Sequence, residues 1–201
     1  MLDLSENNIV KMDDISFLSQ LETLNLEDNQ IRKIEGLEGQ QRLETLYLNR
    51  NRVHKLAGLQ FCCSLRVLQM NNQKLLSGEY FELDMDSLAG VSECLQELEL
   101  TEVKLKGQVQ SFGYLRYLQV LRLGHNLIEG TDGLETALMG MQSLRVLILK
   151  GNPIETQLPK FRDMVLMHSQ SVEELDDKPV LLHERQFLQE FYKRKGGKVP
   201  K

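Results

Sequence analysis

The amino-acid sequence predicts an α/β solenoid, in which short strands from stacked turns form one parallel sheet. The first observation is a period of 22 residues, from Leu21 to Leu43. The second is that no single turn can bury its own apolar residues, so the turns must stack. The third is that one set of residues recurs at this period: Leu21, Leu24, Leu26, Asn29, Ile31, Ile34 and Leu37 are matched by Leu43, Leu46, Leu48, Asn51, Val53, Leu56 and Leu59.

Each repeat places its residues as a short strand and a turn require. In the pattern L-x-x-L-x-L the last two leucines alternate with a polar residue, which indicates a strand with one buried face. The Asn three residues later suits a turn, because its amide can pair with backbone groups that the turn leaves unpaired. This order of leucines and Asn is that of a leucine-rich repeat, and we count about seven repeats over residues 1–157.

The first repeat is incomplete, because its strand residues Leu2 and Leu4 follow no leading Leu. Its outer edge is therefore expected to be uncovered, which invites pairing with another strand. Either a partner covers this edge, or further residues precede Met1 in the natural protein. The second and third repeats, which begin at Leu21 and Leu43, are regular.

The fourth and fifth repeats depart from the pattern. The fourth has Gln73 where Asn is expected, and the repeat after it begins only at Leu95. The extra length is an insertion at about residues 76–94, with an acidic stretch and a short capped helix from about Asp86. In the fifth repeat, Val103 replaces the turn Asn.

The sixth and seventh repeats return to the pattern. The sixth contains Asn126 and is followed by a helix through about Met141, which Asp132 is expected to cap. The seventh runs from Leu144 to Ile154, and its Pro153 stiffens the exit from the last regular turn.

Two further segments follow the repeats. Residues 158–185 are expected to form a C-terminal cap, with a helix and a last partial strand that cover the final core. Residues 186–201 are expected to form a terminal helix that leaves the solenoid, followed by a disordered, Gly-containing tail. The basic residues of this segment include Lys193, Arg194, Lys195 and Lys198.

The composition indicates a soluble intracellular protein. Of 201 residues 41% are hydrophobic, and the formal net charge of -5 argues against nucleic acid or an anionic membrane as the main target. The sequence has no apolar run of about eighteen residues, so it predicts no membrane span. Cys62, Cys63 and Cys94 are odd in number and fit neither a disulfide framework nor a metal site, so we expect free thiols in a reducing compartment.

The predicted sheet presents one concave surface, formed by the side chains that alternate with the strand leucines. A large surface of fixed curvature suits protein recognition, although its polar residues could also serve solubility alone. Val120, Val146 and Ile148 form an apolar group at one end. The candidate partner-binding residues are Tyr47, Asn49, Arg50, Gln69, Asn71, Glu97, Glu99, Arg122, His125, Ile148 and Lys150.

The sequence contains no recognisable catalytic constellation. His54, His125, His168 and His183 lie in different parts of the repeat pattern and have no Ser or Cys partner at a suggestive spacing. An HExxH motif and a glycine-rich phosphate loop are both absent. We therefore expect no enzyme activity, no cofactor, no metal site and no small-molecule substrate.

The 22-residue repeats resemble those of regulatory subunits of protein phosphatase-1, and the likeness includes the cap sequences PKFRD, LDDK and ERQFL. This resemblance implies a protein of the cytoplasm and cytoskeleton, at a cilium or flagellum axoneme, a basal body or a centrosome. It also implies tubulin, axonemal proteins or protein phosphatase-1 as partners.

We therefore expect a non-enzymatic scaffold of a microtubule-associated assembly that binds proteins through the concave surface. Its basic tail would suit an acidic tubulin surface. The alternative is a regulatory subunit that controls the activity or targeting of protein phosphatase-1.

Overall fold

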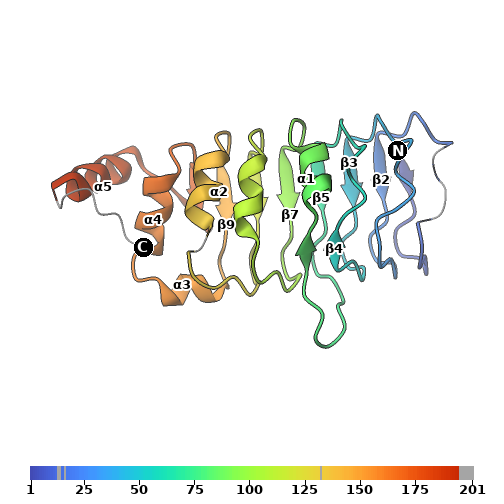
Figure 1. Ribbon diagram of the computed structural model, residues 1–201, viewed down its shortest axis with the longest axis horizontal. Helices are drawn as coiled ribbons and strands as arrows, with labels where there is room; N and C mark the ends of the chain where they lie inside the picture. The colour runs from blue at the N-terminus through green and yellow to red at the C-terminus, as the bar shows by residue number, and fades with distance from the viewer. Residues whose placement is uncertain (13–14, 16, 132, 195–201) are drawn as a thin grey trace.

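The computed structural model describes residues 1–12, 15, 17–131 and 133–194. Within these residues the main sheet has nine strands, in the order β1-β2-β3-β5-β7-β8-β9-β10-β11. Figure 1 shows them side by side along the long axis of the molecule. The strands are β1 (Leu2–Asp3), β2 (Thr23–Asn25), β3 (Thr45–Tyr47), β5 (Val67–Gln69), β7 (Glu97–Glu99), β8 (Val120–Arg122), β9 (Val146–Ile148), β10 (Glu174–Leu175) and β11 (Lys178–Pro179).

The pairing confirms the predicted α/β solenoid. Neighbouring strands from β1 to β10 are parallel, and only the last pair, β10 and β11, is antiparallel. Leucines at the centre of successive strands stand opposite one another and are at most 1% exposed: Leu24, Leu46, Leu68, Leu98, Leu121 and Leu147. The predicted strands and their register are therefore those observed.

Short helices cover one face of the sheet in the later repeats (Figure 1). A second, two-stranded sheet pairs β4 (Lys55–Leu56) with β6 (Glu82–Leu83) of the insertion. The helices are α1 (Met85–Val91), the 3-10 helix Val109–Tyr114, α2 (Leu134–Gly140), α3 (Pro153–Gln157), α4 (Phe161–His168) and α5 (Leu182–Arg194).

One buried amide side chain joins each regular repeat to the repeat before it, and Asn51 is typical. Its Nδ2 donates to the carbonyl of Leu48 in its own turn at 3.1 Å and to the carbonyl of Leu26 in the preceding turn at 2.8 Å. Its Oδ1 accepts the N–H of Ile31 in the preceding turn at 3.0 Å. Asn51 is 0% exposed, so these bonds satisfy groups that water cannot reach.

The same arrangement recurs at Asn29, Gln73, Asn126 and Asn152, and we call these residues with Asn51 the amide ladder. Gln73 was not predicted to take part, but its Nε2 reaches the carbonyl of Leu48 and its Oε1 accepts the N–H of Val53. The residue before each ladder position has a positive φ, as in Asp28 (52°) and Arg50 (56°). This left-handed residue turns the chain at the end of each strand.

The fifth repeat has no amide at its ladder position, as the sequence predicted from Val103. The neighbouring Asn126 compensates in part, because its Oδ1 accepts N–H groups from both Val103 and Leu105, at 3.1 and 3.0 Å. The backbone N–H groups of the fifth repeat are therefore paired although this repeat has no amide side chain at its ladder position.

The cap extends further than the sequence indicated. The boundary expected at residue 186 is wrong for the helix, because α5 begins at Leu182 and does not leave the solenoid. Its first turn is fastened to the cap: Glu184 accepts from Arg162 at 2.6 Å, and Arg185 donates to the carbonyl of Leu166 at 2.7 Å. Leu188 and Tyr192 are 6% and 4% exposed, so they belong to the core.

Two predicted helices have these N-terminal caps. The short helix expected from about Asp86 is α1, and Asp84 caps it, because its carboxylate accepts the N–H of Ser87 at 3.1 Å. The predicted cap of α2, Asp132, lies outside the described residues, and the N-cap position is occupied by Gly133. The final sheet edge is closed by β11 and by Asp176, whose Oδ1 accepts the N–H groups of Leu149 and Lys150.

We predict that Asn51→Ala lowers the free energy of unfolding by roughly 3 kcal/mol or more, because it leaves buried backbone groups in two repeats without partners. Denaturant unfolding followed by circular dichroism measures this. The control Asn8→Ala removes an exposed side chain and should change stability by less than about 0.5 kcal/mol. Equal effects of the two substitutions would contradict the ladder.

Candidate protein-binding surface

The face of the sheet that points away from the core, which we predicted to be the concave surface, carries aligned rows of side chains. Tyr47 stands opposite Gln69, and the register continues without a slip through β7, β8 and β9. The row thus formed is Asn25, Tyr47, Gln69, Glu99, Arg122 and Ile148. The structure therefore brings together, on one surface, residues that the sequence scatters over six repeats.

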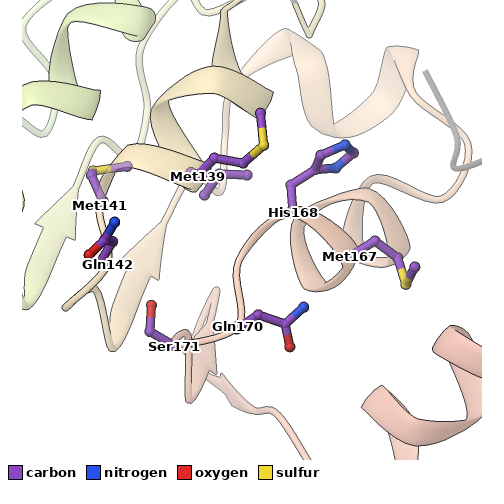
Figure 2. A pocket seen from close by; sticks show the side chains of 8 residues that line it. Met139, Met141, Gln142, Met167, His168, Gln170 and Ser171 are labelled. Carbon is purple, nitrogen blue, oxygen red and sulfur yellow. The ribbon is translucent and has the colours of Figure 1, made fainter.

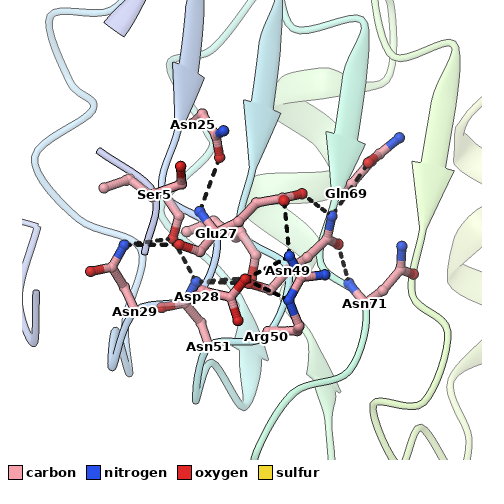
Figure 3. Close-up of polar contacts among 12 residues, drawn as sticks. Ser5, Asn25, Glu27, Asp28, Asn29, Asn49, Arg50, Asn51, Gln69 and Asn71 are labelled. Carbon is pink, nitrogen blue, oxygen red and sulfur yellow. Dashed lines mark hydrogen bonds and ion pairs between the residues drawn. The ribbon is translucent and has the colours of Figure 1, made fainter. Parts of the chain in front are cut away.

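Polar contacts fix the N-terminal part of this surface (Figure 3). Arg50 donates to Asp28 at 2.6 Å and to Glu27 at 3.2 Å. The amide of Asn49 donates to Glu27, and its Oδ1 accepts the N–H of Asn71 at 2.7 Å. The Arg50 bond lowers the pKa of Asp28 and raises that of Arg50, so both groups stay charged.

A second charged cluster lies in the middle of the surface. Arg122 approaches Glu99 at 3.1 Å and Glu97 at 3.6 Å, and Asn71 donates to Glu99 at 2.7 Å. Burial raises the pKa of Glu97, the neighbouring Glu99 raises it further, and Arg122 opposes both. The cluster holds two carboxylates and one guanidinium, so its charge is not balanced internally when both acids are ionised.

The other predicted residues occupy the C-terminal end of the surface. Ile148 is half-buried beside Arg122, and Val120 stands opposite Val146. His125 is exposed at the edge of the sheet, and Lys150 lies 3.8 Å from Asp177 of the cap. This end is the apolar and basic part of the surface.

The predicted basic tail is only partly described. Lys193 and Arg194 are exposed in the last turn of α5, where Arg194 lies 3.7 Å from Glu190. Lys195 and Lys198 lie outside the described residues. The two residues that are described belong to the cap end and not to the concave surface.

A cavity of about 380 Å³ lies between α2 and the end of α4 (Figure 2). Met139, Met141, Met167 and His168 are among its lining residues. His168 is bonded through Nδ1 to the Met164 carbonyl at 2.9 Å, and its Nε2 lies 3.6 Å from Glu135. His168 is the only titratable side chain among the described lining residues, and both of its ring nitrogens already face protein groups. The lining itself therefore contains no second titratable group to pair with it.

No group of three or more His, Cys, Asp or Glu side chains in the described residues is placed to hold a metal ion. No helix in the same residues has the length and apolar character needed to cross a bilayer.

Sequence reasoning missed the ion pairs that hold the surface together. Asp28 and Arg50 are 22 residues apart, which is one repeat period. Glu99 and Arg122 are 23 residues apart, one more than the period. Opposite charges at that spacing lie on adjacent strands, so the repeat period itself was the available signal. Arg50 and Arg122 are consequently engaged within the protein and not free on its surface.

Comparisons with known proteins agree with the architecture. A family model described as "Leucine rich repeat" matches residues 1–53. A crystal structure of an internalin from Listeria monocytogenes str. 4b F2365 superposes with a TM-score of 0.57 at 23% identity, covering 86% of this chain and 52% of that chain. At this identity the likeness shows the fold alone, which is a leucine-rich repeat solenoid.

Curated relatives match a shorter part of the chain. A dynein axonemal assembly factor 1 homolog from Aedes aegypti is 34% identical over 83 residues, which are 41% of this chain and 7% of the relative. Dynein axonemal assembly factor 1 from Peromyscus californicus is 36% identical over 77 residues, or 38% of this chain and 12% of the relative. The chain therefore spans a small fraction of the length of these proteins.

We predict that Glu97→Gln stabilises the folded protein at neutral pH. The pKa of Glu97 is raised on folding, so its ionisation costs stability as the pH rises through that raised value, and Gln removes this cost. Below the ordinary Glu pKa of 4.5 both side chains are neutral, so the difference between variant and wild type should vanish there. Denaturant unfolding at a series of pH values measures it. A difference that stays constant with pH would contradict the assignment.

Proposed function

We propose that this leucine-rich repeat protein is a non-enzymatic scaffold of a cilium-associated assembly and that it docks partner proteins through its concave surface. The observation that carries the proposal is the aligned row from Asn25 to Ile148, held in register by inter-repeat bonds. A surface that is ordered before binding loses little conformational entropy on association. Two relatives named as dynein axonemal assembly factor 1 support the choice of assembly, with axonemal proteins as the partner class.

Within this surface we assign the main contacts to Tyr47, Arg122 and Ile148. They lie on one row, and they combine an aromatic, a guanidinium and an aliphatic side chain, a mixture that is common at the centre of interfaces. All three are half-buried, so a partner can complete their burial. The charged cluster of Glu97, Glu99 and Arg122 then provides orientation through charge complementarity.

We predict that replacing Tyr47, Arg122 and Ile148 together with Ala weakens capture of axonemal proteins by at least about tenfold. The measurement is affinity capture with cross-linking from ciliated-cell extract, with axonemal dynein subunits and tubulin quantified by mass spectrometry. The matched control replaces Tyr114, Arg116 and Met139, which are exposed outside the concave surface. Circular dichroism establishes that both variants fold. Unchanged capture by the first variant would remove the concave surface from the proposal.

We further propose that the basic tail adds an electrostatic contact with the acidic surface of tubulin. Replacing Lys193, Arg194, Lys195 and Lys198 with Gln should reduce co-sedimentation with microtubules several-fold, most strongly at low salt because such contacts are screened. Substitution is preferable to truncation here, because Tyr192 in the last turn of α5 is buried. The control replaces the exposed residues Lys33, Arg52, Lys74 and Lys178 with Gln. Equal losses in the two variants would show that only net charge matters.

A second candidate function is regulation of protein phosphatase-1. It rests on the resemblance of the 22-residue repeats and of the cap sequences PKFRD, LDDK and ERQFL to regulatory subunits of that phosphatase. Purified protein titrated into the purified phosphatase separates the two functions. A change in phosphatase activity or a measured complex would support regulation, whereas neither effect would leave the scaffold alone.

A further inference from the structure

The three cysteines meet at the junction of the third and fourth repeats. Cys62 and Cys63 lie in the turn before Leu65, and Cys94 lies between α1 and Leu95. The strands that follow are paired so that Val67 stands opposite Glu97. Continuing the same register back along both segments places Cys94 opposite Ser64, the neighbour of Cys63. All three thiols are free, as the sequence predicted.

The three thiols differ in their access to solvent. Cys62 is 0% exposed, Cys94 is half-buried and Cys63 is exposed. Cys63 and Cys94 line one surface cavity of about 370 Å³, and Cys62 is not among the residues that line it. The Cys94 sulfur lies 3.7 Å from the carbonyl oxygen of Cys62, in the peptide group that joins Cys62 to Cys63. The cavity therefore brings together one exposed thiol and one sheltered thiol from adjacent repeats.

The surroundings give the two cavity thiols different roles. Burial raises the pKa of Cys94 to about 11, while the charge of Arg66, which lines the same cavity, opposes this rise. Cys94 is therefore protonated at neutral pH and reacts slowly with reagents from solution. A dissolved disulfide meets the exposed Cys63 first, and Cys94 is the second thiol in the same cavity that can displace the other half of the reagent.

We propose that Cys63 and Cys94 form a two-thiol modification site, which a low-molecular-weight disulfide such as glutathione disulfide converts into an inter-repeat disulfide. Adjacent parallel strands are about 4.8 Å apart, and a disulfide joins Cα atoms about 4.4–6.8 Å apart. Residues in neighbouring turns that are displaced by one position fall within this range. The cross-link would join the turns on either side of the long fourth repeat.

The reaction is two successive thiol–disulfide exchanges. The Cys63 thiolate attacks one sulfur of glutathione disulfide, whose S–S bond breaks, and one glutathione thiolate leaves. Cys94 then loses its proton and its sulfur attacks the Cys63 sulfur, which displaces the second glutathione thiolate. The two protein thiols lose two electrons, the reagent gains them, and the two thiol protons pass to the released glutathione.

The test treats the full chain with glutathione disulfide, quenches with acid and maps the tryptic peptides without reduction. Trypsin cleaves after Lys55, Arg66, Lys74 and Lys104, so Cys63 and Cys94 fall on different peptides. We expect these two peptides to be joined. Cys94→Ser should stop at a glutathione adduct on Cys63, and Cys63→Ser should take up at least tenfold less glutathione than the wild type.

Cys62→Ala is the control, because it removes the buried thiol and should leave the cross-link in place. Circular dichroism of each variant verifies the fold. Because Cys62 and Cys63 share one tryptic peptide, fragment-ion spectra of the joined wild-type peptides assign the bond to Cys63, whether or not a variant folds. A wild-type chain that keeps glutathione on Cys63 without joining Cys94 would overturn the proposal. So would a Cys62–Cys63 disulfide, or no reaction under conditions in which the unfolded chain reacts.

Discussion

The structure depends on one interaction, the buried amide that bonds to the backbone of two successive turns. A leucine core alone is not directional, because apolar contact tolerates sliding of one turn over the next. The amide of Asn51 accepts from Ile31 and donates to Leu26 and Leu48, so it permits a single offset between the turns. In a shifted stack these buried donors and acceptors would have no partners. The free-energy cost of leaving them unpaired favours the observed stack.

The ladder also explains the character of the concave surface. Because every strand is held at the same height, side chains one repeat apart become neighbours, and Arg50 can reach Asp28 while Arg122 reaches Glu99. These contacts are half-exposed, so each contributes little to stability. These contacts instead fix the positions of the surface side chains before any partner binds. A partner that pairs with Glu97 or Glu99 competes with one internal Arg and does not have to organise the surface.

The sequence predicted most of the fold because leucine spacing is its strongest pattern. Burial of those leucines is also the largest favourable contribution to folding. The sequence missed features that depend on side-chain reach and on packing between distant segments. Gln73 stands where Asn was expected, and its extra methylene still lets the amide reach Leu48 and Val53. The start of α5 was misplaced because Arg162–Glu184 and Arg185–Leu166 are tertiary contacts with no local pattern. The repeat period placed the candidate side chains in register on one face of the sheet, but their internal ion pairs appear only when charges are compared across the repeat period.

The amide ladder must act as a single cooperative unit if it keeps the surface ordered. Native-state hydrogen exchange read by nuclear magnetic resonance tests this at the amides of Ile31, Val53 and Ile128, whose acceptors are the side chains of Asn51, Gln73 and Asn152. We predict that these amides exchange as slowly as the central strand amides of Leu46 and Leu68, through one shared opening reaction. Exchange of the three amides at the rate of exposed turns would show that the side-chain bonds do not hold the repeats together and would contradict the account.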